Sequence, residues 1–179
     1  MNIKALERKT SVLTSMILSV GEFYHATDNQ DDRNQIETLL GAGIFYLTTS
    51  KQLCSGLISI NALELLRENT NAKLVKEHSF PRKLAANEIL NEKLELLKED
   101  TNLLRNLYIN RYGRYNLVTQ IENGQLRAFQ KLGVFESETD SYEKAGIELI
   151  DLKAIQNDYL FDEIPNLKRY FDRPNFNLN

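Results

Sequence analysis

Helical spacing of apolar residues is the feature that most constrains the fold of this chain. In the N-terminal stretch, apolar side chains recur three and four residues apart, which places them on one face of an α-helix. The spacing returns after a polar break at residues 28–32. The two sets are Leu13, Met16, Ile17, Val20, Phe23 and Tyr24, then Ile36, Leu39, Leu40, Ile44 and Leu47. The chain is therefore expected to be mostly helical.

Glycine and proline mark special positions in these helices. Gly41 and Gly43 lie inside the second helix, where each costs about 1 kcal/mol relative to alanine, so we expect another backbone to pack closely there. A third helix is expected from Ile58. Ser79 suits the N-cap of the next helix and Pro81 suits its first turn.

Three segments are better suited to strands, because they are short, apolar and bounded by turn residues. They are residues 74–75 leading into Glu77-His78, residues 115–119 with Thr119 as a following N-cap, and residues 147–152. We expect a predominantly α-helical α+β fold: a single domain over residues 1–179, with about six helices and a small sheet of two or three short strands.

Composition narrows the class of protein. With 42% hydrophobic and 26% charged residues the chain is globular. The single Cys54 cannot form an internal disulfide, and its apolar neighbours predict a buried thiol in a reducing cytoplasm. Ser and Thr interrupt the N-terminal segment too often for a secretion signal, and no apolar run approaches the ~18 residues of a membrane span. We expect a cytoplasmic protein without a membrane partner.

Charge is distributed unevenly along the sequence. The net charge of −3 argues against a surface that binds nucleic acid everywhere. Residues 101–131 nevertheless contain five cations and only one acid, Glu122, whereas residues 133–165 contain nine acids and two lysines. A basic groove and ordinary variation of solvated faces are both compatible with this pattern.

Glu77 and His78 lie just ahead of Pro81, Arg82 and Lys83, so a carboxylate, an imidazole and phosphate-binding cations converge there. This grouping suits phosphodiester hydrolysis, because a metal neutralises phosphate charge while a base with a near-neutral pKa removes a proton from water.

With Asn102 and Asn110 downstream, this pattern resembles a degenerate form of the HNH, or ββα-metal, nuclease motif. The resemblance implies that Glu77 holds Mg²⁺ or another divalent metal, that His78 is the general base, and that Asn102 or Asn110 completes the metal site. The glycine-rich loop and the second histidine of that motif are missing. A structural, hydrogen-bonded Glu-His pair is the alternative.

Asp140 and the later Asp151-Leu152-Lys153 resemble a second nuclease core, PD-(D/E)xK. That resemblance implies two carboxylates on a metal and a lysine that aligns water. Because such spacing is common by chance, a structural role for these charges is the alternative.

Cations alternate with aromatic rings between residues 105 and 115. The set is Arg105, Tyr108, Arg111, Tyr112, Arg114 and Tyr115. Arginine binds phosphate in two-point geometry and tyrosine stacks on bases, so the set suits a nucleic-acid strand. It also suits a protein interface. In the third interpretation, Tyr108 and Tyr112 pack in the core while the arginines stay in water.

The leading hypothesis is a prokaryotic protein that acts on nucleic acid, with defence or restriction as its role and metal-dependent endonuclease as its enzyme class. Catalysis would use Glu77 and His78, and DNA binding would use Arg82, Lys83, Arg105, Arg111, Arg114 and Tyr112. The alternative is a non-catalytic helical interaction module, an inhibitor or immunity protein, which binds a basic partner through the acidic residues 133–165. The oligomeric state stays open. A solvent-open cleft around His78 favours the enzyme, and a buried His78 disfavours it.

Overall fold

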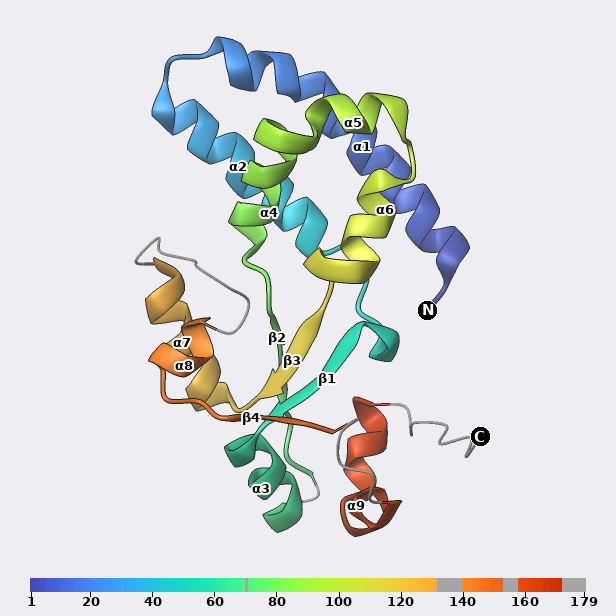
Figure 1. Cartoon of the computed structure of the whole chain (residues 1–179), viewed down its shortest axis with the longest axis vertical. Coiled ribbons are helices and arrows are strands. Elements are labelled where there is room, and N and C mark those ends of the chain that lie inside the picture. Colours follow the sequence, from blue (N-terminus) through green and yellow to red (C-terminus); the bar gives the residue numbers. More distant parts are fainter. Residues whose placement is uncertain (70, 132–139, 153–157, 172–179) are drawn as a thin grey trace. The chain divides into compact units, whose positions relative to one another are not determined.

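The computed structural model describes residues 1–69, 71–131, 140–152 and 158–171. The chain forms two compact units, each built from separate segments. Unit 1 comprises Met1–Thr49 and Phe80–Arg114, and unit 2 comprises Ser50–Ser79 and Tyr115–Asn179. Unit 1 is helical, whereas unit 2 combines helices with a sheet (Figure 1). The predominantly helical α+β class is confirmed, and a single domain over residues 1–179 stays a prediction.

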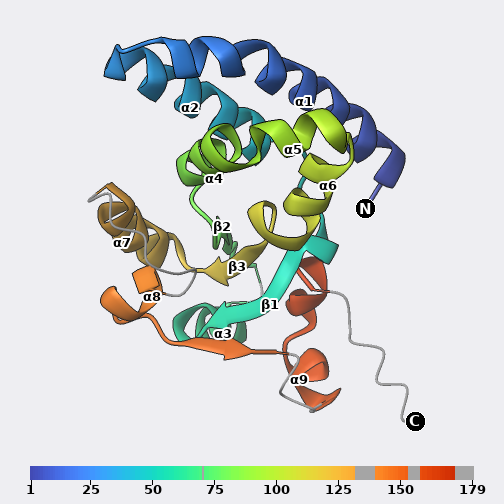
Figure 2. The same ribbon diagram turned by 45° about the horizontal axis from the view of Figure 1, so that its top comes forward.

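Unit 1 is built on the two long helices that apolar spacing predicts. Its helices are α1 (Ile3–Ala26), α2 (Gln30–Phe45), α4 (Arg82–Glu88), α5 (Leu94–Glu99) and α6 (Leu103–Leu107), with π-helical turns at Ile89–Lys93 and Tyr108–Tyr112. α2 packs on α4, and α1 contacts α2, α5 and α6 (Figure 2). Asn2 and Asn29 cap the first two helices through their side-chain oxygens. The buried face of α1 includes Leu6, Leu13 and Ile17.

Gly41 lies where α2 meets the start of α4. A Cβ atom at this position would lie 2.7 Å from the carbonyl oxygen of Arg82, so only glycine lets the two backbones approach this closely. The predicted close approach of a backbone is confirmed at Gly41, whereas at Gly43 the neighbouring atoms belong to the Leu13 side chain. The prediction of Ser79 as the N-cap of α4 is wrong, because Pro81 is the N-cap and no side chain caps that helix.

Unit 2 contains a four-stranded sheet in the order β2-β3-β1-β4. The strands are β1 (Cys54–Ser59), β2 (Val75–His78), β3 (Tyr115–Val118) and β4 (Leu149–Asp151). β1 runs parallel to β3, and the other two pairings are antiparallel. The helices are α3 (Ile60–Glu68), α7 (Gln120–Lys131), α8 (Asp140–Lys144) and α9 (Asp158–Glu163), with 3₁₀ turns at Lys51–Leu53 and Pro165–Arg169.

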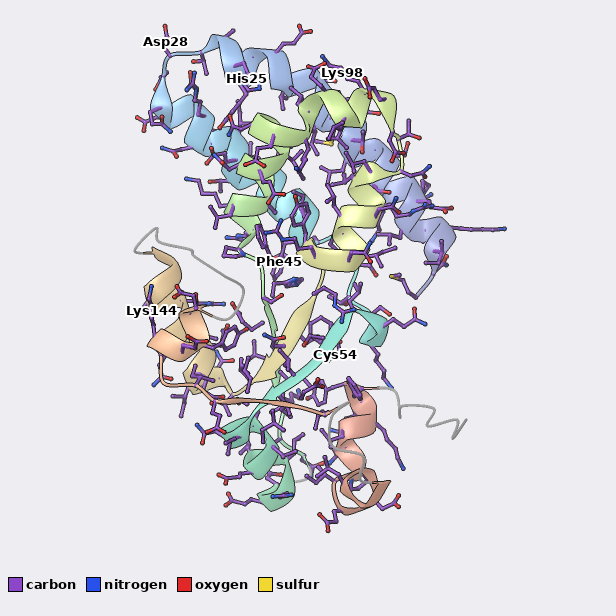
Figure 3. The ribbon with its side chains drawn as sticks, in the orientation of Figure 1. His25, Asp28, Phe45, Cys54, Lys98 and Lys144 are labelled. Carbon is purple, nitrogen blue, oxygen red and sulfur yellow. The ribbon has the colours of Figure 1, made fainter. Side chains whose placement is uncertain are left out.

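Three strands lie where the sequence predicts them, and β1 is additional. The third helix begins at Ile60 and not at Ile58, because Gly56 has a φ of 100° within β1 and Ser59 caps α3. Cys54 on β1 is buried at 3% exposure, as expected (Figure 3). Within the described residues, no helix combines the length and the apolarity needed to span a bilayer.

Candidate functional site

The predicted catalytic pair lies on β2, which pairs with β3 in unit 2. Glu77 is opposite Asn116 in this antiparallel register, and His78 is opposite Tyr115. Since successive side chains on a strand point to opposite faces of the sheet, Glu77 and His78 diverge. Strand alternation thus gives no support to a side-by-side Glu77–His78 pair, which stays a prediction.

His78 lies on the aromatic face of the sheet. Its ring centroid is 6.4 Å from that of Tyr115, and the side chain is only 7% exposed. Burial lowers the pKa of His78 from 6.5 to about 4, because desolvation disfavours the charged imidazolium. At neutral pH the ring is therefore uncharged and a weaker base than an ordinary histidine.

Glu77 lies on the opposite face of the sheet, together with Asn116. The hydroxyl of Ser55 donates a 2.6 Å hydrogen bond to the Oδ1 atom of Asn116. Burial raises the pKa of Tyr142 on α8, and the negative charge of Glu77 raises it further. This face thus collects a carboxylate, an amide and two hydroxyl groups beneath α8.

Glu122 completes the polar face and is only 3% exposed. Its Oε2 atom accepts hydrogen bonds from the Ser59 hydroxyl at 2.6 Å and from the Thr119 backbone N–H at 2.8 Å. Its Oε1 atom accepts one from the Asn61 amide at 3.0 Å. The Thr119 hydroxyl in turn accepts a bond from the Glu122 N–H, which confirms Thr119 as the N-cap of α7. The Thr119-x-x-Glu122 spacing was the available sequence signal for this role.

The proposed metal ligands are divided between the two units. Glu77 belongs to unit 2, whereas Asn102 and Asn110 are exposed residues of unit 1. The Asn102 backbone N–H donates to the Asp100 carboxylate, as in a local turn. In the part of the chain that the structure describes, no group of three or more His, Cys, Asp or Glu side chains is arranged to hold a metal ion.

The alternating arginines and tyrosines have structural partners within unit 1. Tyr108 and Tyr112 are buried, which confirms their packing in the core. The Arg105 guanidinium lies 2.5 Å from the Glu7 carboxylate. Arg111 lies 3.0 Å from Glu88 and stacks over Phe80, with its guanidinium carbon 4.2 Å from the ring centroid.

Tyr115, the last ring of the alternating set, belongs to unit 2 and is also buried. None of the three rings in this set presents the open face on which a base would stack.

The remaining predicted phosphate ligands also belong to unit 1. Lys83 donates to the Asn34 amide oxygen at 2.8 Å and lies 3.5 Å from Glu37. Arg82 is exposed, and Arg114 is half-buried. Glu37, which also accepts a 2.8 Å bond from the Tyr24 hydroxyl, was not predicted from the sequence.

The second nuclease-like set falls partly outside the described residues. Asp140 forms a 3.0 Å ion pair with Lys144 on the next turn of α8 (Figure 3), and Asp151 is exposed on β4. Lys153 lies outside the described residues, as do the acidic residues within 132–139. In the described part of the acidic region, Glu143, Glu148, Asp162 and Glu163 are exposed as well.

Comparisons of the chain with protein-family models, curated proteins and solved structures give no match.

Proposed function

We propose that the chain is a non-catalytic protein-interaction module of the inhibitor or immunity type, which binds a basic partner. The observation that carries the proposal is the acidic surface that runs from α8 through the connecting residues to β4. Glu143, Glu148 and Asp151 are exposed there, and Lys144, the only cation in residues 140–152, is bonded to Asp140. Such a surface attracts a positively charged partner and disfavours an acidic one.

The position of β4 supports the same proposal. β4 is the last strand in the order of the described sheet, and β1 is its one neighbour there. An edge strand presents backbone N–H and C=O groups that an extended segment of a partner can pair with. A basic extended segment would combine this pairing with contacts to the exposed carboxylates.

The nuclease hypothesis receives less support from the geometry and stays a prediction. A general base works best when its pKa lies near the working pH, whereas His78 is buried and its pKa is about 4. Glu77 lies on the other face of the sheet. A metal held by Glu77 would thus be separated by the sheet from a water activated by His78.

Binding of a lysine-rich peptide, measured by calorimetry at low and physiological salt, tests the proposal. Substituting Glu143→Gln, Glu148→Gln and Asp151→Asn together should weaken binding by about tenfold or more, equivalent to about 1.4 kcal/mol. The matched control, Glu64→Gln with Glu68→Gln and Glu99→Gln, removes the same charge from exposed positions elsewhere and should bind as the wild type does. Equal losses of binding affinity in both variants would reject a localised acidic site. Mg²⁺-dependent plasmid cleavage by the wild type, abolished in His78→Ala, would support the nuclease hypothesis instead.

A further inference from the structure

The outer face of α1 in unit 1 is apolar and exposed. Val12, Met16 and Phe23 are 58%, 55% and 57% exposed, although Leu13 and Ile17 on the core-facing side of the helix are buried. Soluble proteins seldom leave several large apolar side chains together in water unless the surface binds something. α1 therefore has two apolar faces, of which the core of unit 1 uses one.

The exposed face has the spacing of a helix-packing seam. Its residues alternate four and three positions apart along the whole helix: Ala5, Lys9, Val12, Met16, Ser19, Phe23 and Ala26. This is the repeat that keeps one side of a helix against a second helix over several turns. Lys9 fits the seam because its ammonium group donates to the Leu47 carbonyl at 2.7 Å, which leaves the aliphatic stem for packing.

A groove of about 450 Å³ runs beside the centre of this seam. It lies between α1 and the end of α2, and Tyr46, which is 72% exposed, forms part of its wall. Val12 and Met16 line the same groove. A second helix laid on the seam would place side chains in this groove and cover the exposed tyrosine ring.

The charges beside the seam select the partner. Arg8 flanks it at the N-terminal end and Glu22 flanks it at the C-terminal end, on the same side of the helix, and both are exposed. Their midpoint along the helix is Ser15, one residue from Thr14, the midpoint of Val12 and Met16. In an antiparallel pair centred on Thr14, Arg8 of one copy and Glu22 of the other are offset by two residues, or about 3 Å along the helix axis, which lets them form an ion pair, whereas a parallel copy leaves them about 21 Å apart.

We propose that α1 is the dimer interface of this protein, and that it packs antiparallel against α1 of a second copy about a two-fold axis. Val12 of each copy packs against Met16 of the other, Phe23 packs over the small Ala5, and Lys9 lies opposite Ser19. Each interface then contains two Arg8–Glu22 ion pairs. A two-fold interface of this kind is self-complementary, as closed homodimers require.

Sedimentation equilibrium between about 1 μM and about 1 mM tests this proposal, because a small interface of one helix from each copy is expected to associate weakly. The wild type should approach twice its mass of 20.7 kDa at high concentration. Met16→Glu should remain a monomer, because association would bury one carboxylate from each copy, two in all, close to the two-fold axis and to each other. The control Leu39→Glu, which replaces an apolar residue 65% exposed on α2, should dimerise as the wild type does.

A charge exchange tests the antiparallel register without touching the apolar seam. Arg8→Glu alone and Glu22→Arg alone should each weaken the dimer by about tenfold or more, since each creates two like-charge pairs. The double variant should recover the wild-type affinity. Circular dichroism verifies that each variant is folded. A wild type that stays monomeric at about 1 mM would overturn the dimer, and a double variant weaker than both single ones would overturn the antiparallel arrangement.

Discussion

The two faces of the sheet in unit 2 offset the desolvation of buried polar groups in different ways. On one face, Glu122 is buried and accepts three hydrogen bonds, and Asn116 is bonded to Ser55. On the other face, burial lowers the pKa of His78. Hydrogen bonds offset the desolvation of a buried polar group, whereas a histidine can offset it by staying neutral. Glu77 and His78, which are adjacent on β2 but lie on different faces, thus have unrelated roles.

Removing Glu122 should give the largest effect, because it leaves the Ser59 hydroxyl, the Asn61 amide and the Thr119 N–H without their acceptor. We expect Glu122→Ala to lower the free energy of unfolding by about 3 kcal/mol in urea denaturation. Glu64→Ala, at an exposed position on α3, should change it by less than about 0.5 kcal/mol. Equal effects would show that the polar face is not a connected network.

A smaller loss is expected at Asn116, which is 1% exposed. Asn116→Ala removes the acceptor of the Ser55 hydroxyl and leaves a small cavity, so the unfolding free energy should fall by about 2 kcal/mol. Asn102→Ala is the matched control, since Asn102 is exposed on unit 1 and its substitution should have little effect. If the control is as damaging as Asn116→Ala, the contrast between buried and exposed amides fails.

The smallest expected effect belongs to Lys76 on the histidine face. Its ammonium group lies 5.2 Å from the centroid of the Tyr115 ring, a contact that contributes at most about 1 kcal/mol. Thermal melts of Lys76→Ala should differ from the wild type by a few degrees at most, with Lys73→Ala, an exposed neighbour, as the reference. A loss of stability as large as that expected for Glu122→Ala would contradict the difference between the two faces of the sheet.

Much of the fold could be predicted from periodicity. Apolar spacing located α1 and α2, and short apolar segments located β2, β3 and β4. The strand β1 was missed because apolar residues around Ile58 continue into α3, and the boundary depends on the conformation of Gly56 and the cap at Ser59. The apolar pattern of the sequence carries no information about where the chain changes from strand β1 to helix α3.

The candidate site was harder to predict, because proximity in sequence is a poor guide to proximity in space. Glu77 and His78 are neighbours in the chain, yet strand alternation separates them. The spacing of Tyr108 and Tyr112 fitted three interpretations, and burial selects core packing. The exposed face of α1 could not be recognised, because its apolar residues and those of the buried face belong to one periodic pattern.

The pKa of His78 tests the central claim most directly. Imidazole resonances followed by NMR against pH, with His25→Asn to leave a single histidine, should give a pKa of about 4. The ordinary value in an unfolded chain is about 6.5, so the unfolded state binds the proton first as the pH falls. Stability due to this group is therefore complete above pH ~6.5 and is lost towards pH ~4, by roughly 3 kcal/mol in total. A His78 pKa near 6.5 or above would contradict a buried structural histidine and return it to the role of general base.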